Sequence, residues 1–147
     1  MEENIDVIFN GFFRYKNGRF YAEDKAVEDI AERYGTPCYV YSYHSLVSKI
    51  KKFKEAFDGI NTLICYSIKA NSNLSILKII KEQGLGADVV SGGELRRALL
   101  AHFPPDKIVF AGVGKKDEEI EMGVKKNIYC FNIENEDEID IIEKRGN

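Results

Sequence analysis

Leu63-Ile64-Cys65-Tyr66-Ser67-Ile68-Lys69-Ala70-Asn71-Ser72-Asn73 joins a mostly apolar run to a polar turn, and this stretch decides the fold. The run 63–68 predicts a buried strand, and the polar residues after it are typical of a turn before a helix. A positive charge at the end of such a strand is costly unless a partner uses it. Lys69 is therefore the first candidate for chemistry, and a lysine that reaches past the strand end into solvent is the alternative.

Strand-like and helix-like segments alternate along most of the chain. Strands are predicted over 38–41, 63–68, 87–90, 107–111 and 128–133, and helices over about 46–57, 74–85, 94–102, 117–126 and 136–144. Such alternation predicts an α/β protein with a parallel sheet covered by helices. The pattern alone leaves two architectures open. One is an open doubly wound sheet, and the other is the first part, about five β/α units, of a (β/α)8 TIM-type barrel, which needs about 250 residues in full.

The N-terminal region has a different pattern. Apolar and aromatic residues alternate from Val7 to Tyr21, and Asn17-Gly18 between two such runs is typical of a β-hairpin turn. A short helix follows and ends at Gly35. We therefore expect residues 1–23 to be a hairpin or extended segment and residues 24–147 to be an incomplete barrel domain.

Composition excludes several classes of function. The 147 residues contain 21 basic and 24 acidic side chains, for a net charge of −3, and the two signs are interspersed. A nucleic-acid surface would need clustered basic residues, and a membrane span would need about 18 consecutive apolar residues. Cys38, Cys65 and Cys130 are far apart, inside predicted strands, and indicate free buried thiols in a cytoplasmic protein. No histidine has the spacing of a metal ligand.

Alternation along the strand 63–68 places Cys65, Ser67 and Lys69 on one side and the bulkier Tyr66 and Ile68 on the other. The first side becomes smaller and more polar toward Lys69, which is typical of a barrel interior that opens into a site at the C-terminal strand ends. A lysine in a partly dry site has a lowered pKa and is more nucleophilic, as Schiff-base chemistry requires.

The next strand also ends in polar residues. Asp88 interrupts the apolar run 87–90, and a cation or a cofactor group at the same strand edge would offset the cost of its burial. Ser91-Gly92-Gly93 then forms a tight turn, whose backbone amides are candidates for contact with an anion or a cofactor. The alternative is a plain turn in which Ser91 caps the following helix and Glu94 completes its first turn.

The strand after that ends in Gly112-Val113-Gly114-Lys115, where the glycines allow close approach of a ligand and Lys115 could meet its negative charge. The alternative is a flexible surface loop with solvated lysines. The spacing of a P-loop is absent. Asn132 and Glu134, near the end of the last strand, are weaker candidates.

Together these segments resemble a known family. Tyr66-Ser67-Ile68-Lys69-Ala70-Asn71 resembles the pyridoxal-phosphate lysine motif of the group IV decarboxylases, which share the alanine-racemase-like barrel. Within this group, residues 88–95 and 108–115 are similar to the corresponding segments of diaminopimelate decarboxylases, and residues 35–41 also match the family. The resemblance covers roughly residues 8–147.

The resemblance implies a pyridoxal 5'-phosphate enzyme, a carboxy-lyase. Lys69 would form the Schiff base with the cofactor, while Asp88 and Ser91 would lie beside the cofactor. The implied reaction is decarboxylation of the amino acid meso-2,6-diaminopimelate to L-lysine and CO2, the last step of lysine biosynthesis, in a cytoplasmic homodimer. Three alternatives remain: another group IV decarboxylase (ornithine, arginine or carboxynorspermidine type), a non-catalytic pyridoxal-phosphate-binding barrel, or an α/β interaction domain in which Lys69 is structural.

The family's later features do not occur in the sequence. These are a glycine-rich phosphate cradle, a histidine stacked on the cofactor, an acidic partner of the pyridine nitrogen and a C-terminal β-domain that would pack with the N-terminal hairpin. We therefore expect the chain to be the N-terminal portion of a longer enzyme.

We predict that residues 1–147 by themselves associate or are poorly soluble and do not decarboxylate amino acids. An arc of five parallel strands leaves two open sheet edges and an unfilled interior. Sedimentation velocity and an assay of CO2 release check this. A soluble monomer with turnover would contradict it.

Overall fold

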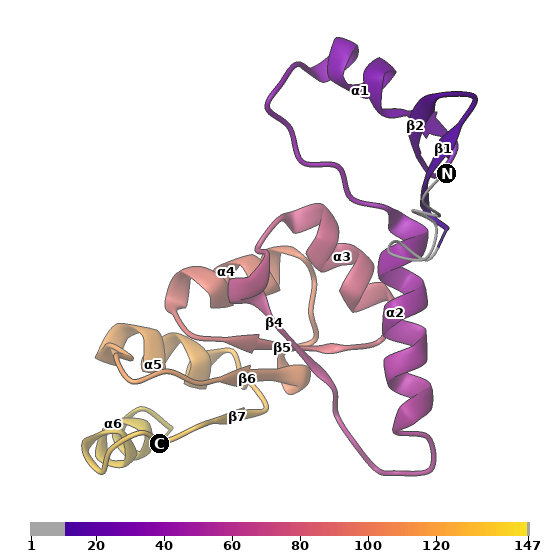
Figure 1. Cartoon of the computed structure of the whole chain (residues 1–147). Helices are drawn as coiled ribbons and strands as arrows, with labels where there is room; N and C mark the ends of the chain where they lie inside the picture. The colour runs from indigo at the N-terminus through magenta and orange to yellow at the C-terminus, as the bar shows by residue number, and fades with distance from the viewer. Residues whose placement is uncertain (1–10, 147) are drawn as a thin grey trace. The chain divides into compact units, whose positions relative to one another are not determined.

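The computed structural model describes residues 11–146, which fall into two compact units, 11–56 and 57–146. The first unit holds a three-stranded antiparallel sheet of β1 (Phe13–Lys16), β2 (Arg19–Ala22) and β3 (Lys25–Ala26). The second holds a four-stranded parallel sheet and its helices (Figure 1). These two units do not test the predicted domain boundary after residue 23, which stays a prediction.

The predicted hairpin is confirmed within the described residues. β1 and β2 pair antiparallel, with Phe13 opposite Ala22. Asn17 and Gly18 between them have φ values of 53° and 74°, the left-handed conformation that a two-residue hairpin turn requires. The start of the predicted alternation, at Val7, lies outside the described residues.

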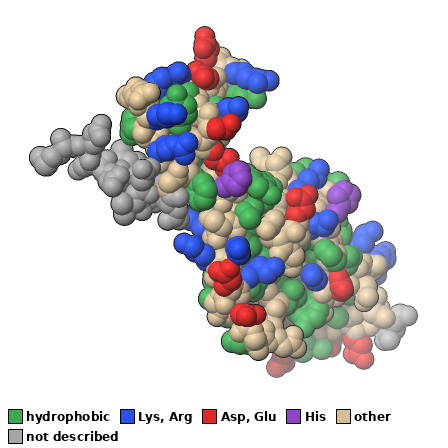
Figure 2. All heavy atoms as spheres, turned by 90° about the vertical axis from the view of Figure 1, so that its right-hand side faces the viewer, with side chains coloured by type: hydrophobic (Ala, Val, Ile, Leu, Met, Phe, Trp, Pro, Cys, Tyr) green, Lys and Arg blue, Asp and Glu red, His purple; other side chains and the backbone are tan. Residues whose placement is uncertain are grey.

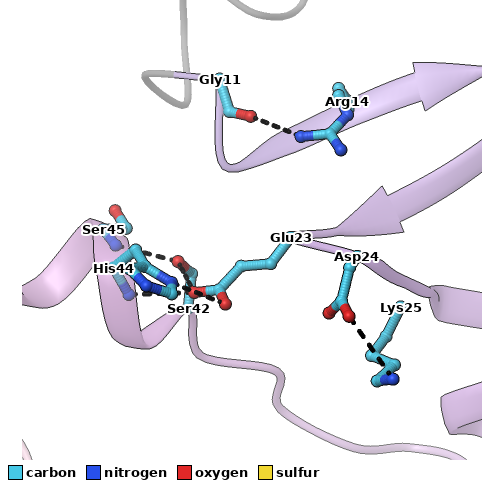
Figure 3. Close-up of polar contacts among 8 residues, drawn as sticks. All are labelled: Gly11, Arg14, Glu23, Asp24, Lys25, Ser42, His44 and Ser45. Atoms are coloured by element: carbon cyan, nitrogen blue, oxygen red, sulfur yellow. Dashed lines mark hydrogen bonds and ion pairs between the residues drawn. The ribbon is translucent and has the colours of Figure 1, made fainter.

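Glu23, directly after β2, joins the hairpin to the start of helix α2 (Tyr43–Ala56). Its Oε1 accepts hydrogen bonds from Ser42 Oγ at 2.7 Å and from the backbone N–H of His44 at 2.9 Å, and its Oε2 lies 2.9 Å from His44 Nδ1 (Figure 3). Ser42 Oγ also accepts from the N–H of Ser45 and so caps the helix. The hydrogen bond from Ser42 and those from His44 outweigh partial burial and lower the pKa of Glu23 to about 2.

We predict that Glu23→Gln lowers the free energy of unfolding by about 1 kcal/mol at neutral pH. The folded-state pKa lies below the ordinary value of 4.5, so the carboxylate adds stability above that pH. This stability is lost as the pH falls toward about 2, where the variant and the parent should converge. Urea denaturation across this pH range measures the difference.

Asp24→Asn is the matched control. It removes the same charge from the next residue, where the carboxylate makes only an exposed ion pair with Lys25 at 3.5 Å. We expect a change below about 0.5 kcal/mol with little pH dependence. Equal effects of the two substitutions would show that the Glu23 hydrogen bonds are not the source.

The rest of the first unit contains one confirmed helix and one wrong prediction. α1 (Val27–Tyr34) ends where the N–H of Gly35 donates to Ala31 O. The predicted strand 38–41 is not formed, and Tyr39 is 91% exposed. A strand requires a hydrogen-bonded neighbour, and this extended segment has none among residues 11–146. Cys38 is accordingly exposed and not buried.

The second unit contains four of the five predicted strands, paired in chain order and all parallel (Figure 1): β4 (Cys65–Ser67), β5 (Gly86–Val89), β6 (Ile108–Phe110) and β7 (Cys130–Phe131). The connecting elements are η2 (Ile68–Ala70), α3 (Leu74–Glu82), α4 (Gly92–Leu100), η3 (Pro105–Lys107), α5 (Asp117–Lys125) and α6 (Asp137–Gly146). The N-cap of α5 is Lys116, whose N–H donates to the Glu119 carboxylate at 3.0 Å.

The two faces of the parallel sheet differ in burial. Ala87, Val89, Ile108 and Phe110 are fully buried, and together with helix residues they form the core: Ile68, Leu77, Ile80, Leu95 and Ile120. Full burial of each large apolar side chain contributes about 1.5–3 kcal/mol. These four strand residues therefore form the face of the sheet that the helices cover.

Gly86 is required where β4, β5 and β6 approach one another most closely. A Cβ at this position would collide with the backbone carbonyl of Lys107 and lie 2.8 Å from Cys65 Sγ. The backbone carbonyl cannot move without disturbing the strand pairing, so the position excludes larger residues.

We predict that Gly86→Ala lowers the free energy of unfolding by about 1–3 kcal/mol, measured by chemical denaturation. Gly114→Ala is the control, since a Cβ there has no atom within 4 Å and we expect a change within about 0.5 kcal/mol. Similar losses in both variants would mean that crowding at Gly86 is not the cause.

Charged side chains of both signs are present on the face of the described residues that Figure 2 shows. On that face they lie among apolar side chains. Within residues 11–146, no helix combines the length and apolar character that a membrane span needs.

Candidate functional site

The second face of the parallel sheet carries smaller and more polar side chains. Ser67, Asp88 and Val109 lie in register across β4, β5 and β6, and Cys130 of β7 pairs with Val109. Cys65 shares this face. All five are only partly buried, in contrast to the helix-covered face. The predicted alternation of Cys65 and Ser67 toward an interior face is therefore confirmed.

Ser67 was missed as a site residue by the sequence reasoning. Its Oγ is buried and has no hydrogen-bond partner in the described part of the chain. A buried hydroxyl of this kind normally finds a partner, so an orphan is a reason to expect a ligand. The only sequence signal was its position two residues before Lys69 on the same strand face.

Lys69 lies in the 3-10 turn η2, directly after β4 and not within the strand. The predicted alternation therefore does not extend to it, because the strand ends at Ser67. The side chain is exposed, and no hydrogen bond or ion pair of its amine occurs among residues 11–146. The amine is thus accessible for reaction at the C-terminal edge of the sheet.

The turn that carries Lys69 is held at several points. Ile68 is fully buried beneath it. Tyr66 Oη donates to the carbonyl of Asn71 at 3.3 Å, and Arg97 Nη1 of α4 donates to the carbonyl of Ser72 at 3.2 Å. These contacts fix the backbone on both sides of the lysine and leave its side chain unconstrained.

Asp88 lies in β5 between the buried residues Ala87 and Val89 and is itself partly buried. Its carboxylate makes no ion pair with Lys69, and no hydrogen bond of it is found in the described chain. The pKa of the Cys65 thiol is raised, mainly by burial and to a smaller extent by the charge of Asp88 and by Cys130. Cys65 therefore stays protonated and does not compete with Lys69 as a nucleophile.

The turn after β5 follows the plain-turn alternative. Ser91 caps α4 by accepting from the N–H of Glu94 at 3.2 Å, and Glu94 Oε2 accepts from the N–H of Val90 at 2.9 Å. The N–H of Gly92 donates to Glu119 Oε1 at 2.6 Å, so it is not free for an anion as one hypothesis required. The Ser91 hydroxyl keeps its own proton available for donation.

Glu119 connects this turn to the next helix. Burial acts to raise its pKa, but the hydrogen bonds from the N–H groups of Lys116 and Gly92 outweigh burial and lower it. The Glu119 carboxylate, which belongs to α5, lies against the first residue of α4 and so interacts favourably with the dipole of α4.

Lys115 differs from both sequence hypotheses. Its side chain is fully buried, so it is neither solvated nor open to a ligand, and it pairs with Glu138 at 2.8 Å. Glu134 Oε1 accepts from the N–H of Gly112 at 3.2 Å, and Asn132 is exposed. Among residues 11–146, no cluster of histidine, cysteine and acidic side chains could hold a metal ion.

Comparisons with known proteins agree with this arrangement. Residues 43–146 match the family described as "Pyridoxal-dependent decarboxylase, pyridoxal binding domain". The diaminopimelate decarboxylase of Pseudomonas fluorescens is 46% identical over 127 residues, which are 86% of this chain and 30% of the relative. The chain thus spans about a third of the length of the relatives it matches.

Solved structures give the same picture. A crystal structure of a protein from Aquifex aeolicus superposes with a TM-score of 0.88 at 39% identity. The match covers 93% of this chain and 34% of the Aquifex chain. The structure of the diaminopimelate decarboxylase of M. jannaschii in complex with L-lysine superposes with a TM-score of 0.84 at 38% identity. The match covers 92% of this chain and 33% of that enzyme. The predicted resemblance, the partial-barrel fold and the pyridoxal cofactor class are confirmed.

Proposed function

Since the chain belongs to the pyridoxal-dependent decarboxylases, with residues 43–146 matching their pyridoxal-binding domain, we propose that Lys69 binds pyridoxal 5'-phosphate covalently. The observation that carries this proposal is a set of three polar groups at one sheet edge: the Lys69 amine, the Asp88 carboxylate and the Ser67 hydroxyl. Within residues 11–146 none of them has a hydrogen bond or ion pair. A buried hydroxyl such as that of Ser67 is normally paired, and a polar ligand bound beside the partly buried Asp88 and the exposed Lys69 amine would supply its partner.

The residues present fit this cofactor. A primary amine is the group that condenses with an aldehyde, and Lys69 supplies one through an exposed side chain on a turn that its neighbours hold in place. Asp88, in register with Ser67, would orient donor groups of the bound cofactor or substrate. Ser91, at the start of α4, would donate its free hydroxyl proton. When bound, the cofactor supplies an electron sink for the electrons that a departing carboxyl group leaves behind.

We propose that the whole protein decarboxylates meso-2,6-diaminopimelate to L-lysine and CO2. Support comes from relatives that are named diaminopimelate decarboxylase at 39–47% identity, and from the lysine complex of the M. jannaschii enzyme. The protein would act in the cytoplasm as a homodimer, the assembly that the family resemblance implies. Residues 1–23 would pack with a C-terminal β-domain, and residues 24–147 would contribute to the barrel.

The test is borohydride reduction in the presence of pyridoxal phosphate, followed by peptide mass spectrometry. The protein is expressed from its own reading frame with whatever follows Asn147. We expect the label on Lys69 and its loss in Lys69→Arg, because a guanidinium stays protonated and cannot attack the aldehyde. Lys78→Arg, an exposed lysine of α3, is the control and should keep the label.

The same protein tests the carboxylate. Asp88→Asn should weaken cofactor affinity by about tenfold or more, because it removes a charged acceptor, and should leave the label on Lys69. A label that spreads over many exposed lysines, or that is absent from Lys69, would contradict the proposed function.

A further inference from the structure

The buried ion pair between Lys115 and Glu138 has no role in the function proposed above. The side chains are 0% and 4% exposed, and Lys115 Nζ lies 2.8 Å from Glu138 Oε2. Lys115 Nζ also donates to the carbonyl of Gly112 at 2.9 Å. The lysine belongs to the loop after β6, and the glutamate belongs to α6, which follows β7.

Further hydrogen bonds close this pair into a clamp between two loops. Glu138 Oε2 accepts from the N–H of Glu134 at 3.2 Å, and Glu134 Oε1 accepts from the N–H of Gly112 at 3.2 Å. Across the two loops, the β6–α5 side thus contributes the Lys115 amine and the N–H of Gly112, and the β7–α6 side contributes the carboxylates of Glu138 and Glu134. We call Gly112, Lys115, Glu134 and Glu138 the loop clamp.

Stability alone does not explain a buried pair of this kind. Removing two charges from water is costly, and well-packed apolar residues of similar size are often as stabilising or more so. What a buried ion pair adds is directionality, because its geometry is satisfied in one arrangement of the chain. In the loop clamp, the ion pair is satisfied only when residues 112–115 lie against residues 134–138, so it holds these two segments together.

The loop clamp lies at the sheet edge that carries Lys69 and Asp88, because the C-terminal ends of parallel strands meet at one edge. A Cβ on Gly112 would lie 3.2 Å from the carbonyl of Val90, the residue before Ser91. Glu119 ties the N–H of Gly92 to α5. A continuous wall therefore runs from Ser91 to Glu138.

We infer that Lys115 is a positioning residue: through the loop clamp it holds the β6–α5 and β7–α6 loops together as one rigid wall of the cofactor site. This inference rests on the proposed function. Lys115 does not touch the cofactor in this role. It acts through Gly112 and Glu138, and its contribution is to keep the wall in place before the cofactor arrives.

The test compares Lys115→Met with Lys116→Met, which removes the same charge from an exposed neighbour. Hydrogen exchange and pyridoxal-phosphate titration are measured on the protein expressed from its own reading frame. For Lys115→Met we expect exchange to rise about tenfold or more in both 112–116 and 134–138, while α3 keeps the parental rate. The dissociation constant for the cofactor should rise about fivefold or more, with Lys69 still fully labelled at saturation. Lys116→Met should match the parent.

Glu134→Ala provides a second variant, because Glu134 is exposed and its loss does not leave a buried charge. It should speed exchange at Gly112 and weaken cofactor binding about twofold to threefold. This variant decides the question if Lys115→Met does not fold.

Two results would overturn the inference. Exchange that rises in 112–116 alone would mean that the loops are not coupled. Loosening of both loops with cofactor affinity within about twofold of the parent would mean that the clamp does not serve the site. Absence of the Lys69 label from the unsubstituted protein would instead overturn the proposed function, and the exchange data would still show whether the loops are coupled.

Discussion

The parallel register of β4 to β7 is the constraint on which the site depends. It places Ser67, Asp88 and Val109 at one level on the partly buried face, while Ala87 and Val89 on either side of Asp88 are fully buried under helices. A slip of one residue would exchange the two faces. Asp88 would then be buried without a partner, at a cost of several kcal/mol. The alternation of one strand therefore fixes both the core and the site.

The same register explains which parts of the fold the sequence could predict. β5 and β6 are apolar runs bounded by turn residues, so their positions follow from composition. The segment 38–41 has the same composition but is exposed, because a strand exists only where a neighbour pairs with it. The alternation predicted through Lys69 stops at Ser67 for a related reason. The chain turns into η2 there, and no strand period applies beyond that point.

Side-chain partners were less predictable than elements. Lys115 and Glu138 are 23 positions apart, and Gly92 and Glu119 are 27 apart. Lys115, Glu119 and Glu138 each lie among other charged residues, a composition typical of a solvated surface. Which of several nearby carboxylates reaches a given amide depends on the twist of the sheet and the angles of the helices, and spacing along the chain does not contain this information. Lys69, in contrast, was found because its neighbours on both sides are apolar or turn-forming.

The charged side chains along this edge differ in whether they have a hydrogen-bond partner in the described part of the chain. Glu94, Glu119 and Glu134 each accept a hydrogen bond from a backbone N–H of a loop, so their charges are committed to the shape of the wall. Lys69 and Asp88 lie at the same edge without such commitments among the described residues. A fold that satisfies its loop amides with its own carboxylates leaves few polar groups for a ligand. Along this edge, the groups that it leaves include Lys69 and Asp88, which are proposed above to hold the cofactor.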